Sequence, residues 1–394
     1  KLEDAFEKVV RKNPNNESRL PLTISAQDGL VDQITYFNNR VASRDVSNYY
    51  LVYNGEFAYN KSTSDGYPFG AVKRLDWYEK GVLSTLYIVF ALKHPEKDDS
   101  DFMTVFYDTD RWHRGVAERA AEGARNHGLL NISADDFFDI DTTMPEDKVE
   151  QEKIGRLLKK LDTLITLHQR KYERLVNIKK SMLDKMFPQN GASVPEIRFK
   201  GFTDPWEQRK LEEYLEVSGQ KNFEGIYTKE DVLSVSGDFG IVNQIEFQGR
   251  SFAGASVANY GVVETGDIVY TKSPLKSNPY GIIKANKGKN GIVSTLYAVY
   301  KPKQSANPEF VQIYFEQDAR MNNYMHPLVN KGAKNDMKVS AENALKGQIV
   351  FPDIKEQRTI SEFFRNLDTL ITLHQRKLEK LQNIKKSCLE KMFV

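Results

Sequence analysis

One eleven-residue segment occurs twice in this chain. The sequence LDTLITLHQRK fills residues 161–171 and returns unchanged at residues 367–377. At the same offset of 206, the surrounding segments 149–187 and 355–393 agree at 25 of 39 positions, and both end in KMF. An internal repeat of this length divides the chain into two halves built on one plan, so it constrains every later interpretation of the fold.

Both copies predict long helices. Apolar side chains recur at spacings of three or four residues, the pattern of a coiled-coil or bundle helix. Apart from Gly155, no glycine or proline interrupts either copy, and Pro188 follows the first. About 35 helical residues form a rod of roughly 50 Å. The predicted seam consists of Leu161, Ile165, His168, Tyr172, Leu175, Leu367, Ile371, His374, Leu378 and Leu381. We interpret the two histidines as polar seam residues, since no cysteine or carboxylate lies at metal-ligand spacing.

A weaker repeat precedes each helix. Residues 54–62 correspond to 265–273, and the later segments 81–87 and 291–297 share the pattern G-x-x-S-T-L-Y. Short apolar and aromatic runs bounded by Gly, Asn and Pro predict strands, and residues 101–107 and 308–321 predict helices, so each domain is expected to be α+β. The predicted order is a first domain (1–147), a long helix (148–188), a second domain (189–353) and a second long helix (354–394). The first domain is expected to lack the lead-in segment of the second, because Lys1-Leu2-Glu3 aligns with Lys210-Leu211-Glu212.

Composition excludes some classes of protein. The longest apolar runs, such as residues 83–92, are too short to span a bilayer, and no charged-then-apolar leader opens the chain. The single cysteine, Cys388, excludes an intramolecular disulfide and favours a reducing cytoplasm. Net charge is +2, but segments 149–187 and 355–394 carry ten and nine Lys/Arg against five Asp/Glu each. The remainder is therefore acidic by about 7 charges, so any binding of DNA must depend on local basic clusters.

Two variable domains, each followed by the same long helix, resemble the specificity subunits of Type I restriction-modification systems. The matching motifs are Glu150-Gln151, Leu161-Asp162 and Met186-Phe187, with Glu356-Gln357, Leu367-Asp368 and Met392-Phe393 in the second copy. The segment 194–206, VPEIRFKGFTDPW, resembles the usual start of a recognition domain in this family.

This resemblance implies two target-recognition domains that each read one half of a bipartite, asymmetric double-stranded DNA target. It also implies that the two helices pair as an antiparallel coiled coil, set the spacer and dock two methyltransferase subunits, through which restriction subunits join. The chain itself is then not an enzyme and binds no cofactor. S-adenosylmethionine, ATP and Mg are expected on the partner subunits. A rod of about 50 Å suits half-sites about one DNA turn apart, roughly 34–36 Å.

Candidate DNA-contacting residues are cations and amides in loops, because phosphates need cations and base edges need paired donors and acceptors. They are Lys61, Ser62, Lys73, Arg74, Arg111, His113, Arg114, Arg125 and Asn126 in the first domain. In the second they are Lys272, Ser273, Lys276, Asn278, Lys284, Lys287, Lys289, Asn290, Lys331, Lys334 and Asn335.

Residues shared by both domains are predicted to contact phosphates, and unshared ones to discriminate bases. The shared pairs are Lys61 with Lys272, and Arg125-Asn126 with Lys334-Asn335. For any single lysine the alternative is an ordinary solvated cation. The shared residues Tyr59 and Tyr270 are interpreted as core residues.

Two other functions stay open. Asn278-Pro279-Tyr280 resembles the Asn/Asp-Pro-Pro-Tyr motif of adenine methyltransferases, but the second proline is missing. No Gly-rich turn for S-adenosylmethionine and no G-x-x-x-x-G-K-[S/T] loop for ATP is present in the sequence. A coiled-coil scaffold that binds no DNA is the other alternative, and the acidic balance outside the helices favours it.

Overall fold

The computed structural model describes residues 1–25, 28–64, 66–120, 128, 130–189, 191–272, 278–329 and 339–393. The chain forms two compact units. Unit 1 comprises Lys1–Arg170 and Gln375–Val394, and unit 2 comprises Lys171–His374. Each unit thus holds a part of both long helices, whereas the sequence predicts four successive segments.

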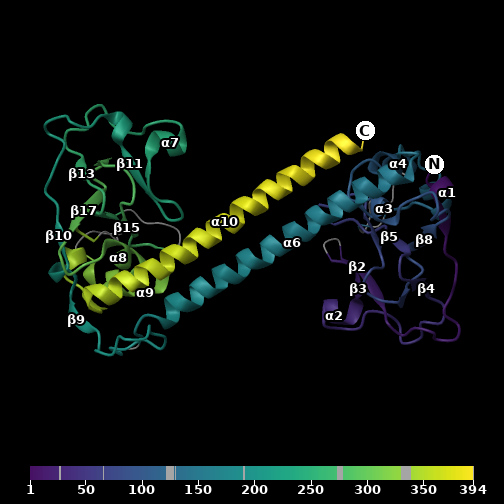
Figure 1. The fold of residues 1–394 in the computed structure, drawn as a ribbon, viewed down its shortest axis with the longest axis horizontal. Helices are drawn as coiled ribbons and strands as arrows, with labels where there is room; N and C mark the ends of the chain where they lie inside the picture. The colour runs from purple at the N-terminus through teal and green to yellow at the C-terminus, as the bar shows by residue number, and fades with distance from the viewer. Residues whose placement is uncertain are drawn as a thin grey trace. The chain divides into compact units, whose positions relative to one another are not determined.

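The long helices are α6 (Lys148–Lys185) and α10 (Ile354–Met392), drawn in Figure 1. Each follows an aspartate that caps it: Asp147 Oδ1 accepts from the Val149 amide at 2.9 Å, and Asp353 Oδ1 accepts from the Glu356 amide at 2.8 Å. Their 38 and 39 residues are consistent with the uninterrupted periodicity of the sequence.

The two helices run antiparallel within each unit. In unit 1, Lys385 near the end of α10 pairs with Asp162 of α6 at 2.6 Å. In unit 2, Lys179 near the end of α6 pairs with Asp368 of α10 at 2.7 Å. The predicted seam residues Leu161, Leu367 and Leu378 are buried, and the other seven are half-buried.

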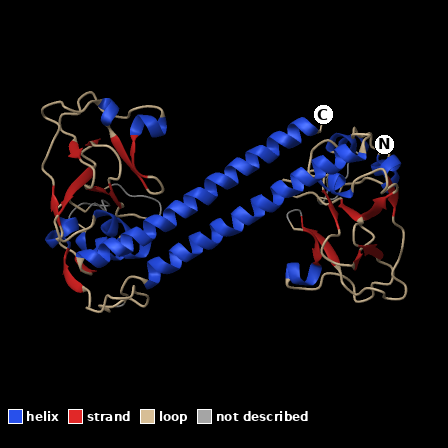
Figure 2. Cartoon of the chain, viewed as in Figure 1, coloured by secondary structure: helices blue, strands red, loops and turns tan. Residues whose placement is uncertain are grey.

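Unit 1 contains short strands and helices, which Figure 2 distinguishes by colour. They are α1 (Leu2–Ala5), β1 (Phe6–Lys8), β2 (Leu22–Ser25), β3 (Gly29–Asp32), α2 (Gln33–Phe37), β4 (Tyr50–Tyr53), β5 (Phe57–Asn60), β6 (Ala71–Arg74), β7 (Lys80–Leu83), β8 (Ile88–Leu92), α3 (Ser100–Phe106), α4 (His113–Arg119) and α5 (Ala134–Phe138).

Unit 2 repeats this order with the additional elements β9, η2, η3 and β18. Its elements are β9 (Glu207–Lys210), η1 (Leu211–Glu213), β10 (Leu215–Val217), η2 (Lys229–Asp231), β11 (Leu233–Ser236), β12 (Gly240–Asn243), α7 (Gln244–Gln248), β13 (Gly261–Val263), β14 (Ile268–Thr271), β15 (Ile283–Ala285), β16 (Gly291–Val293), β17 (Tyr297–Pro302), α8 (Pro308–Tyr314), α9 (Asp318–Met325), η3 (His326–Leu328), η4 (Asn343–Leu345) and β18 (Gln348–Phe351).

The sheets of the two units have the same topology. Four antiparallel strands lie in the order β1-β8-β5-β6 in unit 1 and β10-β17-β14-β15 in unit 2. The β2–β3 hairpin corresponds to the β11–β12 hairpin, and the two-stranded antiparallel pair β4–β7 corresponds to the pair β13–β16. The prediction of two similar α+β domains is confirmed. The helix expected over 308–321 is two helices, α8 and α9, because the chain turns at Phe315 and buries that ring in the core.

Tyr59 and Tyr270 occupy matching places in the central strands, and both are fully buried, as predicted. Their hydroxyls donate to backbone carbonyls ten residues further on, Phe69 O at 2.8 Å and Tyr280 O at 2.6 Å. Burial raises the pKa of both hydroxyls, so they remain neutral donors. These residues are structural.

Each long helix ends in a phenylalanine that enters a core. Phe187, after α6, is 1% exposed in the core of unit 2, where it meets Trp206 and Phe310. Phe393, after α10, is 4% exposed in the core of unit 1 and stacks on Phe102 at 5.3 Å. The helix that follows one domain therefore completes the core of the other unit. Within the described ranges, no helix has the length and apolar character needed to cross a membrane.

Candidate nucleic-acid interface and the junctions behind it

Three candidates in unit 1 reach solvent. Ser62, Arg111 and Arg114 are exposed. The Arg114 side chain is 89% exposed, and its Nε donates to Glu118 at 2.8 Å along α4. A pair this exposed is weak, so Arg114 can exchange it for a phosphate or a base edge.

His113 is half-buried between rings. Its ring centroid lies 5.0 Å from that of Phe69 and 4.6 Å from that of Trp112. Burial lowers the pKa of His113 below its usual 6.5. An uncharged, packed imidazole is a weaker candidate for a phosphate contact than its exposed neighbours.

The shared lysines Lys61 and Lys272 each bind a backbone carbonyl within their own unit. Lys61 Nζ donates to Ile132 O at 3.3 Å, and Lys272 Nζ donates to Thr295 O at 2.8 Å. Both lysines follow the end of a central strand and tie it to a neighbouring loop. A phosphate contact by this pair stays a prediction.

Arg74 lies at the end of β6 and is held by two carboxylates. Its side chain is 10% exposed and lies 2.6 Å from Asp76 and 2.8 Å from Asp101. The geometry favours a role in fastening β6 to α3 over a role in DNA contact.

Lys73 and Lys284 share one register position, because the Val72–Tyr59 pairing of β6 with β5 matches the Ile283–Tyr270 pairing of β15 with β14. Lys73 Nζ lies 2.9 Å from Asp108, and that carboxylate also lies 3.7 Å from Lys385. Since Lys385 in turn pairs with Asp162, four charges form one cluster between the sheet and both helices.

Unit 2 contains the matching cluster. Lys179 bridges Glu316 at 2.5 Å and Asp368 at 2.7 Å, and Lys284 is 8% exposed beside them. Burial opposes protonation of Lys179, but the two carboxylates raise its pKa above the usual value. Burial lowers the pKa of Lys284, which makes no ion pair among the described residues. Lys73 and Lys284 therefore belong to junctions between sheet and helices.

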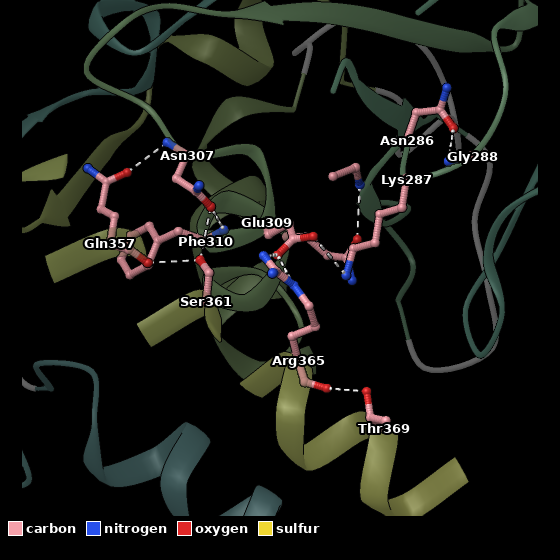
Figure 3. A network of polar contacts seen from close by, with 12 residues as sticks. Asn286, Lys287, Gly288, Asn307, Glu309, Phe310, Gln357, Ser361, Arg365 and Thr369 are labelled. Carbon is pink, nitrogen blue, oxygen red and sulfur yellow. Dashed lines mark hydrogen bonds and ion pairs between the residues drawn. The ribbon is translucent and has the colours of Figure 1, made fainter. Parts of the chain in front are cut away.

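Other candidates in unit 2 reach solvent on the loop after β15. The side chain of Lys289 is 91% exposed and lies 3.9 Å from Glu246. That of Lys287 is 47% exposed and lies 3.7 Å from Glu309 (Figure 3). Asn290 is exposed but accepts from the Thr265 amide at 2.8 Å. These pairs are long enough for both lysines to be free to contact a phosphate.

Asn278 is 6% exposed, and its Nδ2 donates to Asp318 at 2.7 Å. Its burial favours a structural role at the start of α9. Seven further candidates lie outside the described residues: Arg125, Asn126, Ser273, Lys276, Lys331, Lys334 and Asn335.

A polar network joins α10 to the rest of unit 2 (Figure 3). Gln357 Oε1 accepts from the Asn307 amide at 2.9 Å, and the Ser361 hydroxyl donates to Asn307 Oδ1 at 2.9 Å. In unit 1, Gln151 Oε1 accepts from the Asp99 amide at 2.8 Å. The buried glutamine of the repeated Glu-Gln motif thus links each long helix by a hydrogen bond to the start of the helix packed on it.

Sequence reasoning missed two sets of residues. One is the charge pair Asp162–Lys385 with its copy Asp368–Lys179, although all four positions lie in the duplicated helices. The other is a group of exposed rings beside the β2–β3 and β11–β12 hairpins. The rings are Tyr36 and Phe37 in unit 1, and Phe239, Phe247 and Phe252 in unit 2. The alternation of apolar and polar residues along a strand could not reveal these rings, since they lie after the strands or in the turn between them.

Over the described ranges, no group of three or more His, Cys, Asp or Glu side chains is arranged to hold a metal ion. A cavity of about 620 Å³ lies against the charge cluster of unit 1 and is lined by Asp108, Arg111, Asp162 and Lys385, among others.

No family model matches the chain. The S subunit of a Type I restriction-modification system from M. genitalium superimposes with a TM-score of 0.55 at 14% identity, covering all of this chain and 95% of that one. The chain has the fold of a Type I S subunit. Two further solved chains match at full coverage of this chain but lower TM-scores. They are the HsdS subunit of Thermoanaerobacter tengcongensis (0.43, 15% identity, 95% of that chain) and a chain from work on assembly and conformational transition of the type I R-M system (0.44, 14%, 96%).

The S-subunit fold accounts for the duplication. The repeat predicted two units of one topology, and the resemblance implied that the two long helices pair antiparallel, as they do within each unit. At 14% identity, the comparison supports a shared fold. It does not identify the DNA-binding residues, which depend on the side chains of this chain.

Proposed function

We propose that this chain is the DNA sequence-recognition subunit of a cytoplasmic Type I restriction-modification complex. Each unit reads one half of a bipartite, asymmetric target, and the two long helices set the spacer. The observation that carries the proposal is the duplication itself: two units with the same sheet topology, attached to two copies of one helix, in the fold of an S subunit.

Exposed cations on loops support DNA binding. Arg111 and Arg114 in unit 1, and Lys287 and Lys289 in unit 2, reach solvent with at most weak surface pairs. None of these four residues is needed to hold a strand or a helix junction. Exposed cations can contact phosphates, which position a protein on duplex DNA, or base edges, which specify its sequence. Because none of these four is shared by both units, we assign them to base edges.

Exposed leucines on the helices support docking of two methyltransferase subunits. Leu167 of α6 is 45% exposed, and its copy in α10, Leu373, is 44% exposed. Val176, Leu370 and Ile384 are also exposed. Because Leu167 and Leu373 are copies of each other and equally exposed, the repeat offers one matching apolar position on each helix, which suits two identical partners. The partner subunits supply S-adenosylmethionine, methyl transfer and, with the restriction subunits, ATP- and Mg-dependent cleavage.

A footprint of the reconstituted complex tests the proposal. With methyltransferase subunits bound, two protected patches of duplex separated by an unprotected gap are expected. The matched variant Leu167→Glu with Leu373→Glu should prevent assembly and leave each unit folded, since both side chains already face solvent.

Other outcomes would support the rival functions. Absence of any footprint from a fully assembled complex would favour the coiled-coil scaffold. Methyl transfer to DNA by the purified chain alone would favour the methyltransferase.

A further inference from the structure

Each unit carries a small arm, built from a hairpin, one helical turn and the loop after it. In unit 1 the arm is β2–β3, α2 and residues 38–43, and in unit 2 it is β11–β12, α7 and residues 249–254. In Figure 1, α2 and α7 each lie at the edge of their own unit. Asp32 caps the turn in unit 1 and Asn243 caps it in unit 2, each accepting from the amide two residues further on at 3.0 Å.

The same hydrogen bond closes the loop after each turn. Gln33 Oε1 accepts from the Ala42 amide in unit 1, and Gln244 Oε1 accepts from the Phe252 amide in unit 2, both at 2.6 Å. The two arms therefore share one backbone plan. Side chains that follow the shared glutamine lie at equivalent places in the two units.

An exposed aromatic ring occupies the same position of each arm, three residues after the shared glutamine. Tyr36 is 49% exposed in unit 1, and Phe247 is 46% exposed in unit 2. A second ring lies beside each, Phe37 with its centroid 5.0 Å from Tyr36 and Phe239 with its centroid 5.2 Å from Phe247. Grouped apolar rings that remain in contact with water, at matching places in two domains, indicate a binding surface.

The loop that carries each ring is basic. Residues 36–43 and 247–254 each contain one arginine and no carboxylate. Glu246, the carboxylate that precedes the second segment, lies 3.9 Å from Lys289, which offsets its charge. Rings interleaved with cations are the side chains on which nucleic-acid bases stack.

In unit 2 the ring of Phe247 borders a cavity of about 810 Å³. Ile241 and Ile245 also line this cavity, and Lys289 and Asn290 line it from the loop after β15. Lys289 is one of the exposed cations assigned above to a base edge. Because the ring and this lysine share one cavity, DNA is favoured over a protein as the partner that covers the ring.

We infer that Tyr36 and Phe247 insert into the base stack of duplex DNA, one ring in each half-site. The inference rests on the proposed reading of DNA by the two units. The half-sites of an asymmetric target differ in sequence, so a contact common to both must not depend on sequence. Stacking meets this requirement, because every base has a π face and the rings of tyrosine and phenylalanine are equally flat.

An inserted ring partly unstacks and kinks the duplex at one base step. A methyltransferase must take its target base out of the stack, and this costs least where the stack is already weakened. The two rings therefore prepare each half-site for the partner methyltransferase subunit that modifies it.

The fluorescence of 2-aminopurine, which rises when this base is unstacked, tests the inference on the complex assembled with methyltransferase subunits. The probe is placed in turn at each position of the duplex that the footprint shows to be protected. A rise that depends on the ring is expected in each half-site. Phe247→Ala should abolish this rise in one half-site and leave the other, and Tyr36→Ala should do the reverse. Each variant should weaken DNA binding about tenfold.

Conservative and matched variants make the test specific. Phe247→Tyr and Tyr36→Phe should keep the rise, since each keeps a flat ring. Trp77→Ala in unit 1 and Phe223→Ala in unit 2 are the controls, because these side chains are 74% and 70% exposed and lie outside the arms. Both controls should leave fluorescence and affinity within about twofold. The half-site that keeps its signal in each alanine variant shows that the chain is folded and bound.

Three outcomes would overturn the inference. Unchanged fluorescence after removal of both rings, on a duplex that still shows two protected patches, would refute it and leave the proposed function standing. Release of the methyltransferase subunits by the alanine variants would assign the rings to a protein contact. Absence of any footprint from the assembled complex would contradict the inference and the proposed function together.

Discussion

Replacing Phe187 with alanine is expected to destabilise unit 2 and leave unit 1 unchanged, although Phe187 follows the helix that leaves the first domain. The ring is 1% exposed. Its centroid lies 5.9 Å from Trp206, 5.7 Å from Phe310 and 6.3 Å from Phe364, and the Arg320 guanidinium lies 4.5 Å above it. All of these residues belong to unit 2.

The magnitude follows from burial. Truncating a buried phenylalanine to alanine costs about 3–5 kcal/mol, through lost transfer energy and the cavity that remains. That is a change of roughly 100- to 4,000-fold in the unfolding equilibrium of unit 2. Loss of the cation–π contact with Arg320 places the expected value in the upper half of the range.

Hydrogen exchange at increasing denaturant, followed by mass spectrometry, measures the stability of each unit separately. A single melting curve of a chain with two units does not separate the two stabilities. Protection around Phe310 and Phe351 should fall, and protection around Phe90 should not. Phe393→Ala is the matched control, and it should lower protection around Phe90 alone, since Phe393 contacts Phe102 and Phe106. A Phe187→Ala effect below about 1 kcal/mol, or one that is equal in both units, would refute the conclusion that Phe187 completes the core of unit 2.

Three further predictions concern charges. Lys179→Met should destabilise unit 2 by about 1–3 kcal/mol in denaturant unfolding, discounted because Asp368 is 43% exposed. Lys284→Met should be neutral or stabilising, since it removes a buried cation that makes no ion pair among the described residues. Burial lowers the pKa of His113 in the folded unit below 6.5, so the unfolded chain binds the proton more readily. The stability of unit 1 should therefore fall as the pH drops from about 7.5 to 5.5. His113→Gln should remove this pH dependence, and an unchanged dependence would disprove the assignment to His113. Lys289 is not shared by the first domain, so Lys289→Ala should relax the sequence preference of the complex at one position by about 1–3 kcal/mol, and an equal weakening on all DNA sequences would contradict a base contact.

The helices and the duplication were predictable because their signals are local. Leu161, Ile165 and the other seam positions recur every three or four residues, which predicts a helix. The exact copy at residues 367–377 predicts a second helix of the same kind. Core positions such as Tyr59 and Tyr270 followed from their places in apolar runs repeated in both halves.

The candidate site was predictable only in part, because the role of a cation depends on partners far along the chain. Lys73 and Lys284 have the charge that a phosphate needs, but Asp108 lies 35 residues beyond Lys73 and Lys385 comes from the other end of the sequence. Arg74 likewise owes its burial to Asp101 on α3. Exposure, which separates Lys289 from these residues, is a property of the folded unit and has no signature in the sequence.

The placement of Phe393 has a consequence for synthesis on the ribosome. Unit 1 acquires its last core ring only when the final residues of the sequence emerge, although most of its strands lie within the first hundred. At about 5–20 residues per second, the newly made first domain waits roughly 10–45 seconds after residue 170 with Phe102 and Phe106 uncovered. The core of the first domain therefore stays partly exposed until residue 393 has been made, and a truncated message yields a first domain that lacks this ring.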